Sequence, residues 1–287
     1  MPLWKAVLLG LYYQATLPLR WWNVRRARAE GRVPLVVLCY HRTADDIATP
    51  WTISNRVFAR QIRWLRRHFE LISLAETQRR IRSGVNHRPA LSITFDDGYA
   101  ENCLHALPLL VGQQIPCTYF VTARNVLEGV PFEHDMGCGH RFPANTAEQL
   151  RALVAAGVQL GAHSYNHPDL GRITDPGQLR VELVDARDKL QAAVGCPIRY
   201  FAFPFGQQAN LSRQAFDLAA AAGYEAACSA YGGFNLPGQD GFHLQRIAVD
   251  TSMIRLKNRV TGDPRKRNLP RFAWEPPAGW KASHVAT

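Results

Sequence analysis

Strand-like and helix-like segments alternate from residue 33 to residue 249, and no other feature of the sequence restricts the fold as strongly. Short apolar runs rich in β-branched residues, such as 33–40 and 91–95, predict buried strands. Stretches with apolar residues at helical spacing, such as 55–69 and 176–194, predict helices between them. Strands that alternate with helices favour a parallel sheet. Because an α/β barrel commonly takes about 250 residues, we expect one large barrel-like domain.

The same patterns assign most of the remaining chain. Further strands are expected at 70–73, 116–122, 158–162, 199–203, 224–229 and 243–249. Further helices are expected at 75–82, 100–111, 146–156 and 212–222, the third of them opening with a capping box of Thr146 and Gln149. Residues 42–54 and 125–145 lack periodicity, so we expect two long loops that shape a binding groove.

Charge and cysteine content narrow the class of partner and the compartment. The formal net charge is +11, but the arginines gather near the two ends and are not interleaved with aromatic residues as on a nucleic-acid platform. We therefore expect no nucleic-acid partner and favour an anionic membrane surface or glycan. The six cysteines include no C-x-x-C pair, which indicates buried free thiols in a reducing compartment, although a disulfide bridge remains open.

Residues 1–32 form an apolar segment that ends in a cluster of arginines. Its unbroken apolar part is shorter than the roughly 20 residues of a membrane-spanning helix, and no cleavage-site pattern follows it. Tryptophans and tyrosines beside arginines suit the headgroup zone of a membrane. Two interpretations remain: a helix lying in the membrane interface, with the main domain in the cytoplasm or else in the cell envelope, or a helix that packs on that domain or protrudes.

Ionisable residues follow several of the predicted strands. Asp96 and Asp97 come directly after one strand, and His41 ends another. His163 and His167 follow a third. In a parallel sheet these strand ends meet on one face, where the sites of such folds lie. Two imidazoles and one carboxylate suit a catalytic zinc with an open position, and the spare carboxylate and imidazole could act as base and acid.

Three motifs give this pattern a family resemblance. They are Thr-Phe-Asp-Asp-Gly-Tyr at 94–99, His-Ser-Tyr-Asn-His at 163–167 and Phe-Ala-Phe-Pro-Phe-Gly at 201–206. In this order the chain resembles the polysaccharide deacetylases, the NodB-homology group of carbohydrate esterase family 4. The Tyr-His pair at 40–41 is similar to that of the circularly permuted branch that includes the poly-N-acetylglucosamine deacetylases. The resemblance covers residues 33–249 and implies an α/β fold, a distorted (β/α) barrel.

The resemblance also implies roles for site residues. Asp97, His163 and His167 would hold a divalent metal, most often zinc. Asp96 would be the general base that takes a proton from the attacking water. His41 would be the general acid that protonates the leaving amine.

Further assignments follow from the third motif and from departures. The backbone N–H of Phe205 would complete an oxyanion hole. Ala202 stands where many members of the family have an arginine, so the role of that arginine is either absent or supplied by another group, such as Arg199 or Arg246. The Asp-Trp motif that orients the acid in non-permuted members has no match here, which leaves the orienting group of His41 unassigned. We expect a structural or secondary role for His243.

Residues of the two long loops could also contribute. His134, Asp135 and His140 could supplement the metal site, but we expect them to contact substrate or solvent. Trp51 could stack on a sugar ring or cover the core.

The sequence thus predicts three segments: 1–32, an apolar and basic helix and candidate membrane anchor; 33–252, the deacetylase-like catalytic domain; and 253–287, a basic and irregular tail. The expected function is metal-dependent removal of N-acetyl groups from an N-acetylated sugar in a polysaccharide or glycan precursor. Two alternatives are an O-acetyl esterase that acts on a glycan and an inactive glycan-binding domain. The sugar, the metal and the oligomeric state are left open.

Overall fold

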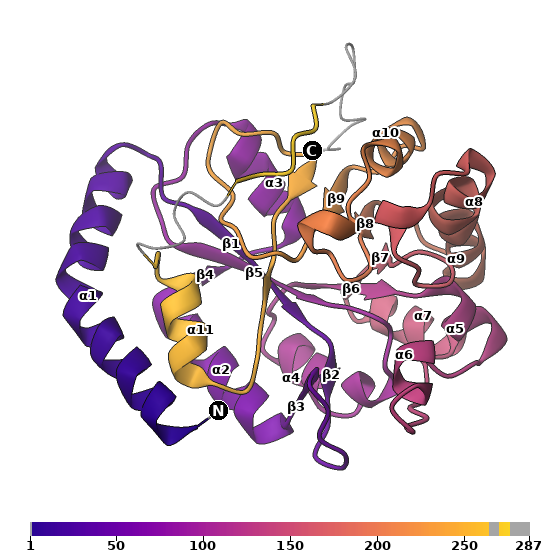
Figure 1. Ribbon diagram of the computed structural model, residues 1–287, viewed down its shortest axis with the longest axis horizontal. Helices are drawn as coiled ribbons and strands as arrows, with labels where there is room; N and C mark the ends of the chain where they lie inside the picture. The colour runs from indigo at the N-terminus through magenta and orange to yellow at the C-terminus, as the bar shows by residue number, and fades with distance from the viewer. Residues whose placement is uncertain (1, 264–269, 276–287) are drawn as a thin grey trace.

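The computed structural model describes residues 2–263 and 270–275. Its centre is a nine-stranded sheet in which every strand pair is parallel (Figure 1). The strands are β1 (Leu35–Tyr40), β4 (Glu70–Leu71), β5 (Ala90–Phe95), β6 (Cys117–Val121), β7 (Gln159–Ala162), β8 (Tyr200–Ala202), β9 (Ala226–Cys228), β10 (His243–Leu244) and β11 (Ile247–Ala248). Their order is β10-β9-β8-β7-β6-β5-β1-β11, with β4 beside β5. A separate two-stranded sheet pairs β2 (Arg42–Thr43) with β3 (Thr52–Ile53).

The two edges of the main sheet are joined by the shortest connection in it. β10 pairs with β9 and β11 pairs with β1 at the opposite edge, yet only Gln245 and Arg246 separate them. The sheet is therefore curled into a distorted (β/α) barrel, as the sequence predicted. The single strand expected at 243–249 is wrong. The N–H and C=O of Gln245 bond to the side chain of Asn235 at 2.8 and 2.9 Å instead of continuing a ladder, and Arg246 is wholly buried.

Helices cover the outside of the curled sheet (Figure 1). They are α2 (Asn55–His68), α3 (Leu74–Arg82), α4 (Ala106–Gly112), α5 (Ala123–Glu128), α6 (Glu133–Met136), α7 (Ala147–Ala155), α8 (Pro176–Arg180), α9 (Ala186–Val194) and α10 (Arg213–Ala221). Most of their apolar faces meet the strands in one large core that includes Leu65, Leu107, Leu190 and Phe216. Leu74 and Ile81 of α3 instead belong to a second, smaller core. The capping box predicted at the start of α7 is confirmed, since Thr146 and Gln149 each bond the other's backbone N–H.

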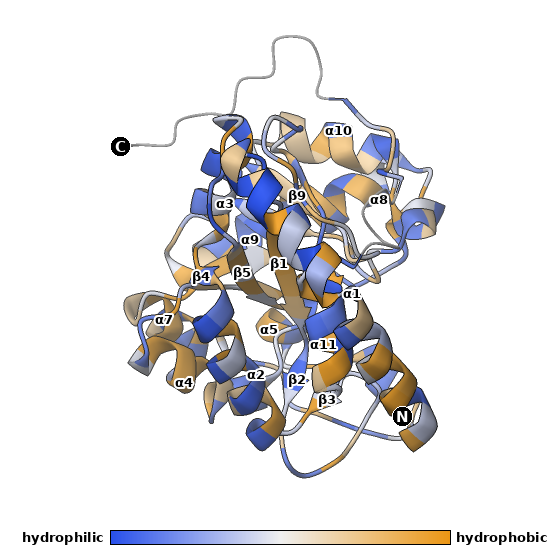
Figure 2. Ribbon diagram, turned by 90° about the vertical axis from the view of Figure 1, so that its left-hand side faces the viewer, coloured by the Kyte–Doolittle hydropathy of each residue, from blue (hydrophilic) through white to orange (hydrophobic). Residues whose placement is uncertain are grey.

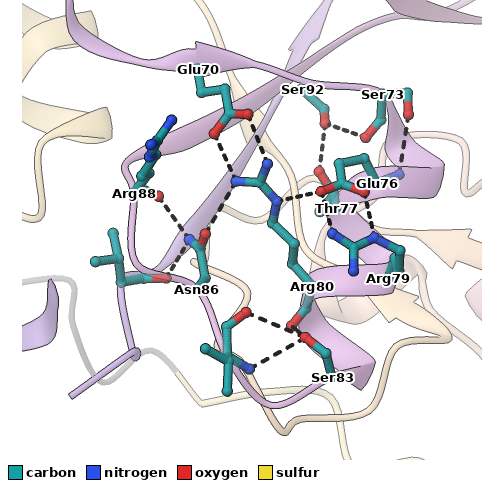
Figure 3. A network of polar contacts seen from close by, with 12 residues as sticks. Glu70, Ser73, Glu76, Thr77, Arg79, Arg80, Ser83, Asn86, Arg88 and Ser92 are labelled. Carbon is teal, nitrogen blue, oxygen red and sulfur yellow. Dashed lines mark hydrogen bonds and ion pairs between the residues drawn. The ribbon is translucent and has the colours of Figure 1, made fainter. Parts of the chain in front are cut away.

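A network of polar contacts fastens α3 to the sheet (Figure 3). Arg80 reaches Glu70 on β4 at 2.8 Å and Glu76 in the first turn of its own helix at 2.6 Å. Hydrogen bonds from Arg79 and then Arg80 lower the pKa of Glu76 to about 2 against the opposing effect of burial. Next to them, Thr77 and Ser92 of β5 share a hydrogen bond of 2.6 Å. Exposed pairs contribute little each, so the network serves mainly to set the position of α3.

Several predicted elements need correction. The helix expected at 100–111 is interrupted, because a 3-10 turn at Ala100–Cys103 ends before α4 begins, and the buried Asn102 bonds Thr43 and His41 instead. The loop expected at 125–145 contains most of α5 and all of α6. The helix expected at 176–194 is present, with a π turn at Val181–Asp185.

The expectation of an irregular tail beyond 253 is wrong for its first part. Met253–Val260 is a helix, α11, with Leu256 and Val260 buried. At eight residues, α11 is too short for the spacing of its apolar residues to indicate a helix from the sequence.

The helix α1 (Leu3–Ala29), which has 27 residues, packs against α11 on the outside of the molecule (Figure 1). No helix among the described residues has the length and hydropathy of a membrane span. Residues 264–269 and 276–287 of the predicted tail lie outside the described residues.

Candidate active site

The carboxyl ends of the parallel strands bring the predicted site residues together. Tyr40 at the end of β1 pairs with Phe95 at the end of β5, so His41 and Asp96 follow at the same level. On the other side of β5, Val121 of β6 pairs with Ala162 of β7, directly before His163. This arrangement follows from strand register, since residues at equivalent positions of paired strands are neighbours.

Asp97, His163 and His167 form a compact group of possible metal ligands. Asp97 Oδ1 lies 3.5 Å from His163 Nε2 and 3.4 Å from His167 Nε2. The three ligand atoms all lie within 4.8 Å of one another. Asp97 and His163 are buried, and the side chain of His167 is 15% exposed. The group is thus closed on the protein side and accessible beside His167.

The backbone at this group is held in an unusual conformation. Asp97, Ser164 and His167 have φ values of 71°, 63° and 62°, in the left-handed region that non-glycine residues rarely adopt. The N–H of His167 donates to Ser164 Oγ at 2.9 Å and closes the turn. Strained residues of this kind cluster at functional sites, where the surrounding structure compensates their cost.

The protonation states of the group suit metal binding. Burial, partly offset by the neighbouring carboxylates, lowers the pKa of His163 to about 4, so its imidazole is neutral at physiological pH. Its Nδ1 lies 2.8 Å from Ala202 O and must donate there, which leaves the lone pair of Nε2 facing Asp97. Burial alone would oppose ionisation of Asp97, but the hydrogen bond with His167 and the nearby histidines hold its pKa far below the usual value.

Glu182 supports the turn that carries both histidines, and the sequence reasoning missed it. Its Oε2 accepts hydrogen bonds from the N–H groups of Tyr165 and Asn166 at 3.0 and 2.9 Å, and its Oε1 accepts one from Asn166 Nδ2 at 2.7 Å. The carboxylate is 2% exposed and lies in the π turn. The sequence does contain a signal for Glu182, because this acidic residue lies beside Leu183 on the face of the helix that was predicted to be buried.

Asp96 is paired with Arg246. The guanidinium binds both carboxylate oxygens, from Nη1 to Oδ1 at 2.6 Å and from Nη2 to Oδ2 at 2.8 Å. Of the two arginines considered in place of the one missing at Ala202, Arg246 is the one that contacts Asp96. Arg199 instead faces Glu225 at 3.6 Å with half of its side chain exposed. Burial opposes ionisation of Asp96, but the charge of Arg246 and its hydrogen bonds hold the pKa of this carboxyl group below the usual range.

Cys39 and His41 also lie close to Asp96. The thiol of Cys39 donates to Asp96 Oδ2 at 3.1 Å, and burial raises its pKa, so it is a neutral donor. A ring nitrogen of His41 lies within 4.8 Å of both the thiol and the carboxylate. Among the described residues no side chain or backbone group is hydrogen-bonded to the His41 imidazole. Its orienting group therefore stays unassigned.

Phe205 lies at the edge of the same cluster. Its φ of 59° is again left-handed, and no described residue accepts a hydrogen bond from its N–H. Its ring lies 5.0 Å from the ring of His167 in an edge-on arrangement and is 53% exposed. A free main-chain donor beside the ligand group is what an oxyanion hole requires.

A cavity of about 500 Å³ opens beside His167 and Phe205, and the loop at 125–145 supplies most of its wall. His134 lines it. Tyr99 Oη lies 2.8 Å from both His134 Nε2 and Asp135 Oδ2, and Trp51 Nε1 donates to Asp135 at 3.1 Å. The predicted groove-forming role of this loop thus has a structural basis.

Two other histidines lie apart from the cavity. His140 stacks on Phe142 with ring centroids 5.5 Å apart. His243 is buried, and its Nε2 lies 2.9 Å from Ser229 Oγ. Neither lines the cavity beside His167, and the surroundings of His243 fit the structural role expected of it.

The barrel carries a candidate metal site at the carboxyl edge of its parallel sheet. The sequence model of the polysaccharide deacetylase family matches residues 83–227, and the chain belongs to this family. The predictions of the family and of the barrel are therefore confirmed.

Similar proteins agree with this assignment. The structure of IcaB from Ammonifex degensii has 26% identity and a TM-score of 0.66, covering 80% of this chain and 97% of that one. The Streptococcus pyogenes deacetylase PplD, solved with acetate, has 20% identity and a TM-score of 0.65 over 79% and 98% of the two chains, which shows the fold. A chitooligosaccharide deacetylase of Bradyrhizobium sp. (strain ANU 289) is 29% identical over 132 residues, 45% of this chain and 51% of the relative.

Proposed function

We propose that this protein is a metal-dependent hydrolase that removes N-acetyl groups from an N-acetylated sugar in a polysaccharide or glycan precursor. The observation that carries the proposal is the ligand group of Asp97, His163 and His167 directly beside the Arg246-paired Asp96, whose Oδ2 lies 3.9 Å from His163 Nε2. Chitooligosaccharides carry N-acetyl groups, so the name of the Bradyrhizobium relative favours this substrate class.

The residues present fit a divalent metal. Two imidazoles and one carboxylate form the ligand set of a catalytic zinc with room for further ligands, and the Nδ1 contact of His163 is the usual outer support of such a ligand. Bound there, zinc would supply Lewis acidity that acidifies water and polarises the acetyl carbonyl.

Asp96 would receive the proton of the attacking water. Its lowered pKa keeps it ionised and therefore able to accept. Although Oδ2 accepts from Arg246 and Cys39, a carboxylate has about four acceptor positions, so one remains for the water. A carboxylate with a lowered pKa is a weak base, which suffices only if the water is itself acidified.

His41 and Phe205 would complete the reaction. An amide nitrogen leaves poorly as an anion, so the amine must receive a proton. The His41 imidazole would donate it, and its position within 4.8 Å of Asp96 supports this role. The N–H of Phe205 would donate to the oxyanion of the tetrahedral intermediate.

The test is acetate release from matched N-acetylated and O-acetylated oligosaccharides. Asp96→Asn should lower turnover on the N-acetyl substrate by about 10²- to 10⁴-fold, the usual contribution of general base catalysis. His41→Asn should cost a similar factor on that substrate and less on the O-acetyl one. His140→Asn, a histidine stacked on Phe142 away from the cavity, is the control.

An O-acetyl esterase is the second candidate, favoured by the lack of a hydrogen-bonded partner for the His41 imidazole among the described residues. Small and equal losses on both substrates in His41→Asn would support it. Undiminished turnover in Asp96→Asn would remove the role of Asp96 as the base in both hydrolase assignments. Absence of acetate release from either substrate by the wild-type chain would leave the glycan-binding domain.

A further inference from the structure

The outer face of α1 is apolar. By the outer face of α1 we mean eight apolar residues that are all between 47% and 81% exposed: Leu3, Trp4, Val7, Leu8, Leu11, Leu19, Trp21 and Trp22. At about 100° per residue these eight residues fall within about half of the helix circumference, so they form one apolar stripe, with residues 12–18 between its two parts. Figure 2 shows the hydrophobic character of α1 near the N-terminus. Surface helices of globular proteins normally show the reverse pattern, with apolar residues facing inward.

The inner face of α1 carries the polar contacts. Arg20 is only 3% exposed and donates to Asn258 Oδ1 at 2.8 Å and to Asn258 O at 3.1 Å, both on α11. Tyr12 Oη donates to Asp263 Oδ1 at 2.7 Å. Asn258 Nδ2 in turn donates to Leu9 O at 3.2 Å. If α1 rotated to bury its apolar stripe, Arg20 and Asn258 would lose their hydrogen bonds to each other. Because losing such buried hydrogen bonds is unfavourable, these contacts keep the stripe facing outward.

The charges around the stripe are cationic. Glu30 is the first acidic residue of the sequence, so α1 itself carries none. Lys5 lies over the ring of Trp4 at 5.2 Å, and Arg25 lies over the ring of Trp21 at 4.5 Å. Exposed tryptophans with neighbouring cations are the composition of a helix at the boundary between lipid headgroups and acyl chains.

We propose that the outer face of α1 docks onto the surface of an anionic lipid bilayer, with the helix lying in the plane of the interface. At 27 residues the helix is roughly 40 Å long, which gives the apolar stripe enough length for shallow insertion along its side. Since Arg20 and Tyr12 hold α1 to α11 and Asp263, docking would keep the catalytic barrel close to the lipid surface. This inference does not depend on the proposed reaction.

The test uses the full chain and two kinds of vesicle, one of phosphatidylcholine alone and one of equal parts phosphatidylcholine and phosphatidylglycerol. Co-sedimentation should show binding to the mixed vesicles that weakens with added salt, because exposed charges are screened. Leu8→Gln, Leu11→Gln and Trp22→Gln together should lower the partition coefficient about tenfold or more. Leu104→Gln, at a leucine 68% exposed outside α1, should leave binding unchanged.

A second variant separates charge from apolar contact. Arg25→Gln with Arg26→Gln should weaken binding to the anionic vesicles by about fivefold for each charge removed, with little change for neutral vesicles. The far-ultraviolet circular dichroism spectrum and the midpoint of thermal unfolding should be close to those of the wild type in all variants, which shows that they fold.

Two results would overturn the proposal: failure of the wild-type chain to bind the anionic vesicles, or equal binding by the triple variant. A dimer that the triple variant dissociates, without vesicle binding, would instead assign the stripe to a second copy of this chain.

Discussion

Asp96 shows how far a single carboxylate depends on its neighbours. It is 2% exposed, and a lone buried carboxylate would be strongly disfavoured as an anion. Arg246 supplies the compensating charge with two hydrogen bonds, and its Nε donates to Ser229 O at 3.0 Å, which fixes the plane of the guanidinium. The pair therefore keeps the proposed base ionised and correctly oriented.

Replacing this arginine should affect stability and pH dependence together. Arg246→Met leaves a buried carboxylate without its partner, which we expect to cost about 3–5 kcal/mol in the free energy of unfolding. It should also raise the pKa of Asp96. Since activity requires the ionised form, the acid limb of the pH–rate profile should move to higher pH.

Urea unfolding and acetate release against pH would measure both effects. Arg199→Met removes an arginine that is half exposed and should change neither quantity by much. An acid limb that stays in place in Arg246→Met would show that the arginine does not tune Asp96.

The grouping of the proposed metal ligands could be predicted from sequence because Asp97 and His163 follow the ends of recognisable strands and His167 lies in the same short motif as His163. Arg246 could not be preferred over Arg199 in this way, because the choice depends on how the sheet closes. Arg246 lies in the short connection between β10 and β11, and it becomes buried beside Asp96 only when the sheet closes. Closure depends on the pairing of β1 with β11 and of β9 with β10, which the local sequence pattern does not indicate.

At the scale of elements, the π turn between α8 and α9 is tied to the site. π turns inside α-helices frequently occur at functional sites. Here the turn at Val181–Asp185 contains Glu182, whose carboxylate holds the N–H groups of the turn between the two histidines. The helix at 176–194 was predictable from the spacing of its apolar residues. The π turn inside it was not, because the one extra residue of such a turn changes that spacing too little to be recognised in the sequence.

Neutralising that carboxylate should loosen the histidine turn. Glu182→Gln keeps the size of the side chain but replaces one acceptor oxygen with a donor group that faces N–H groups. We expect zinc affinity to fall about 10- to 100-fold, as for other outer-shell partners of metal ligands. Competition with a zinc-binding dye would measure this.

The control for that variant is Glu148→Gln, on the exposed side of α7, which should keep wild-type affinity. Equal affinities in the two variants would mean that the turn holds its shape without Glu182.

At the scale of the whole molecule, metal binding and folding should be linked. The three proposed ligands come from the ends of β5 and β7, so the group exists only when the sheet is formed. Zinc at 100 times its dissociation constant should then stabilise the folded state by about 2.7 kcal/mol. Thermal unfolding with zinc and with a chelator would measure the difference. The stabilisation by zinc should vanish in His167→Ala and persist in His140→Ala. Stabilisation that persists in both variants would place the metal elsewhere.

Acid stability should depend on His243, which belongs to the sheet closure and not to the proposed site. It lies in β10 and packs against the ring of Phe216 at 5.0 Å. Burial, followed by the charge of Arg271, lowers its pKa to about 3, whereas the unfolded chain has the ordinary value of about 6.5. Between these values the unfolded state binds a proton that the folded state excludes, so stability falls as the pH falls from 6.5 toward 3.

His243→Gln should remove this part of the pH dependence. Relative to the wild type, the loss in free energy of unfolding between pH 7 and pH 5 should be smaller by about 2 kcal/mol, measured by urea titration at the two pH values. The change at neutral pH itself reflects altered packing and is not the quantity of interest. His105→Gln, at an exposed histidine, should retain the wild-type difference. If His243→Gln also retains it, the acid sensitivity of the barrel arises from groups other than the one buried at its closure.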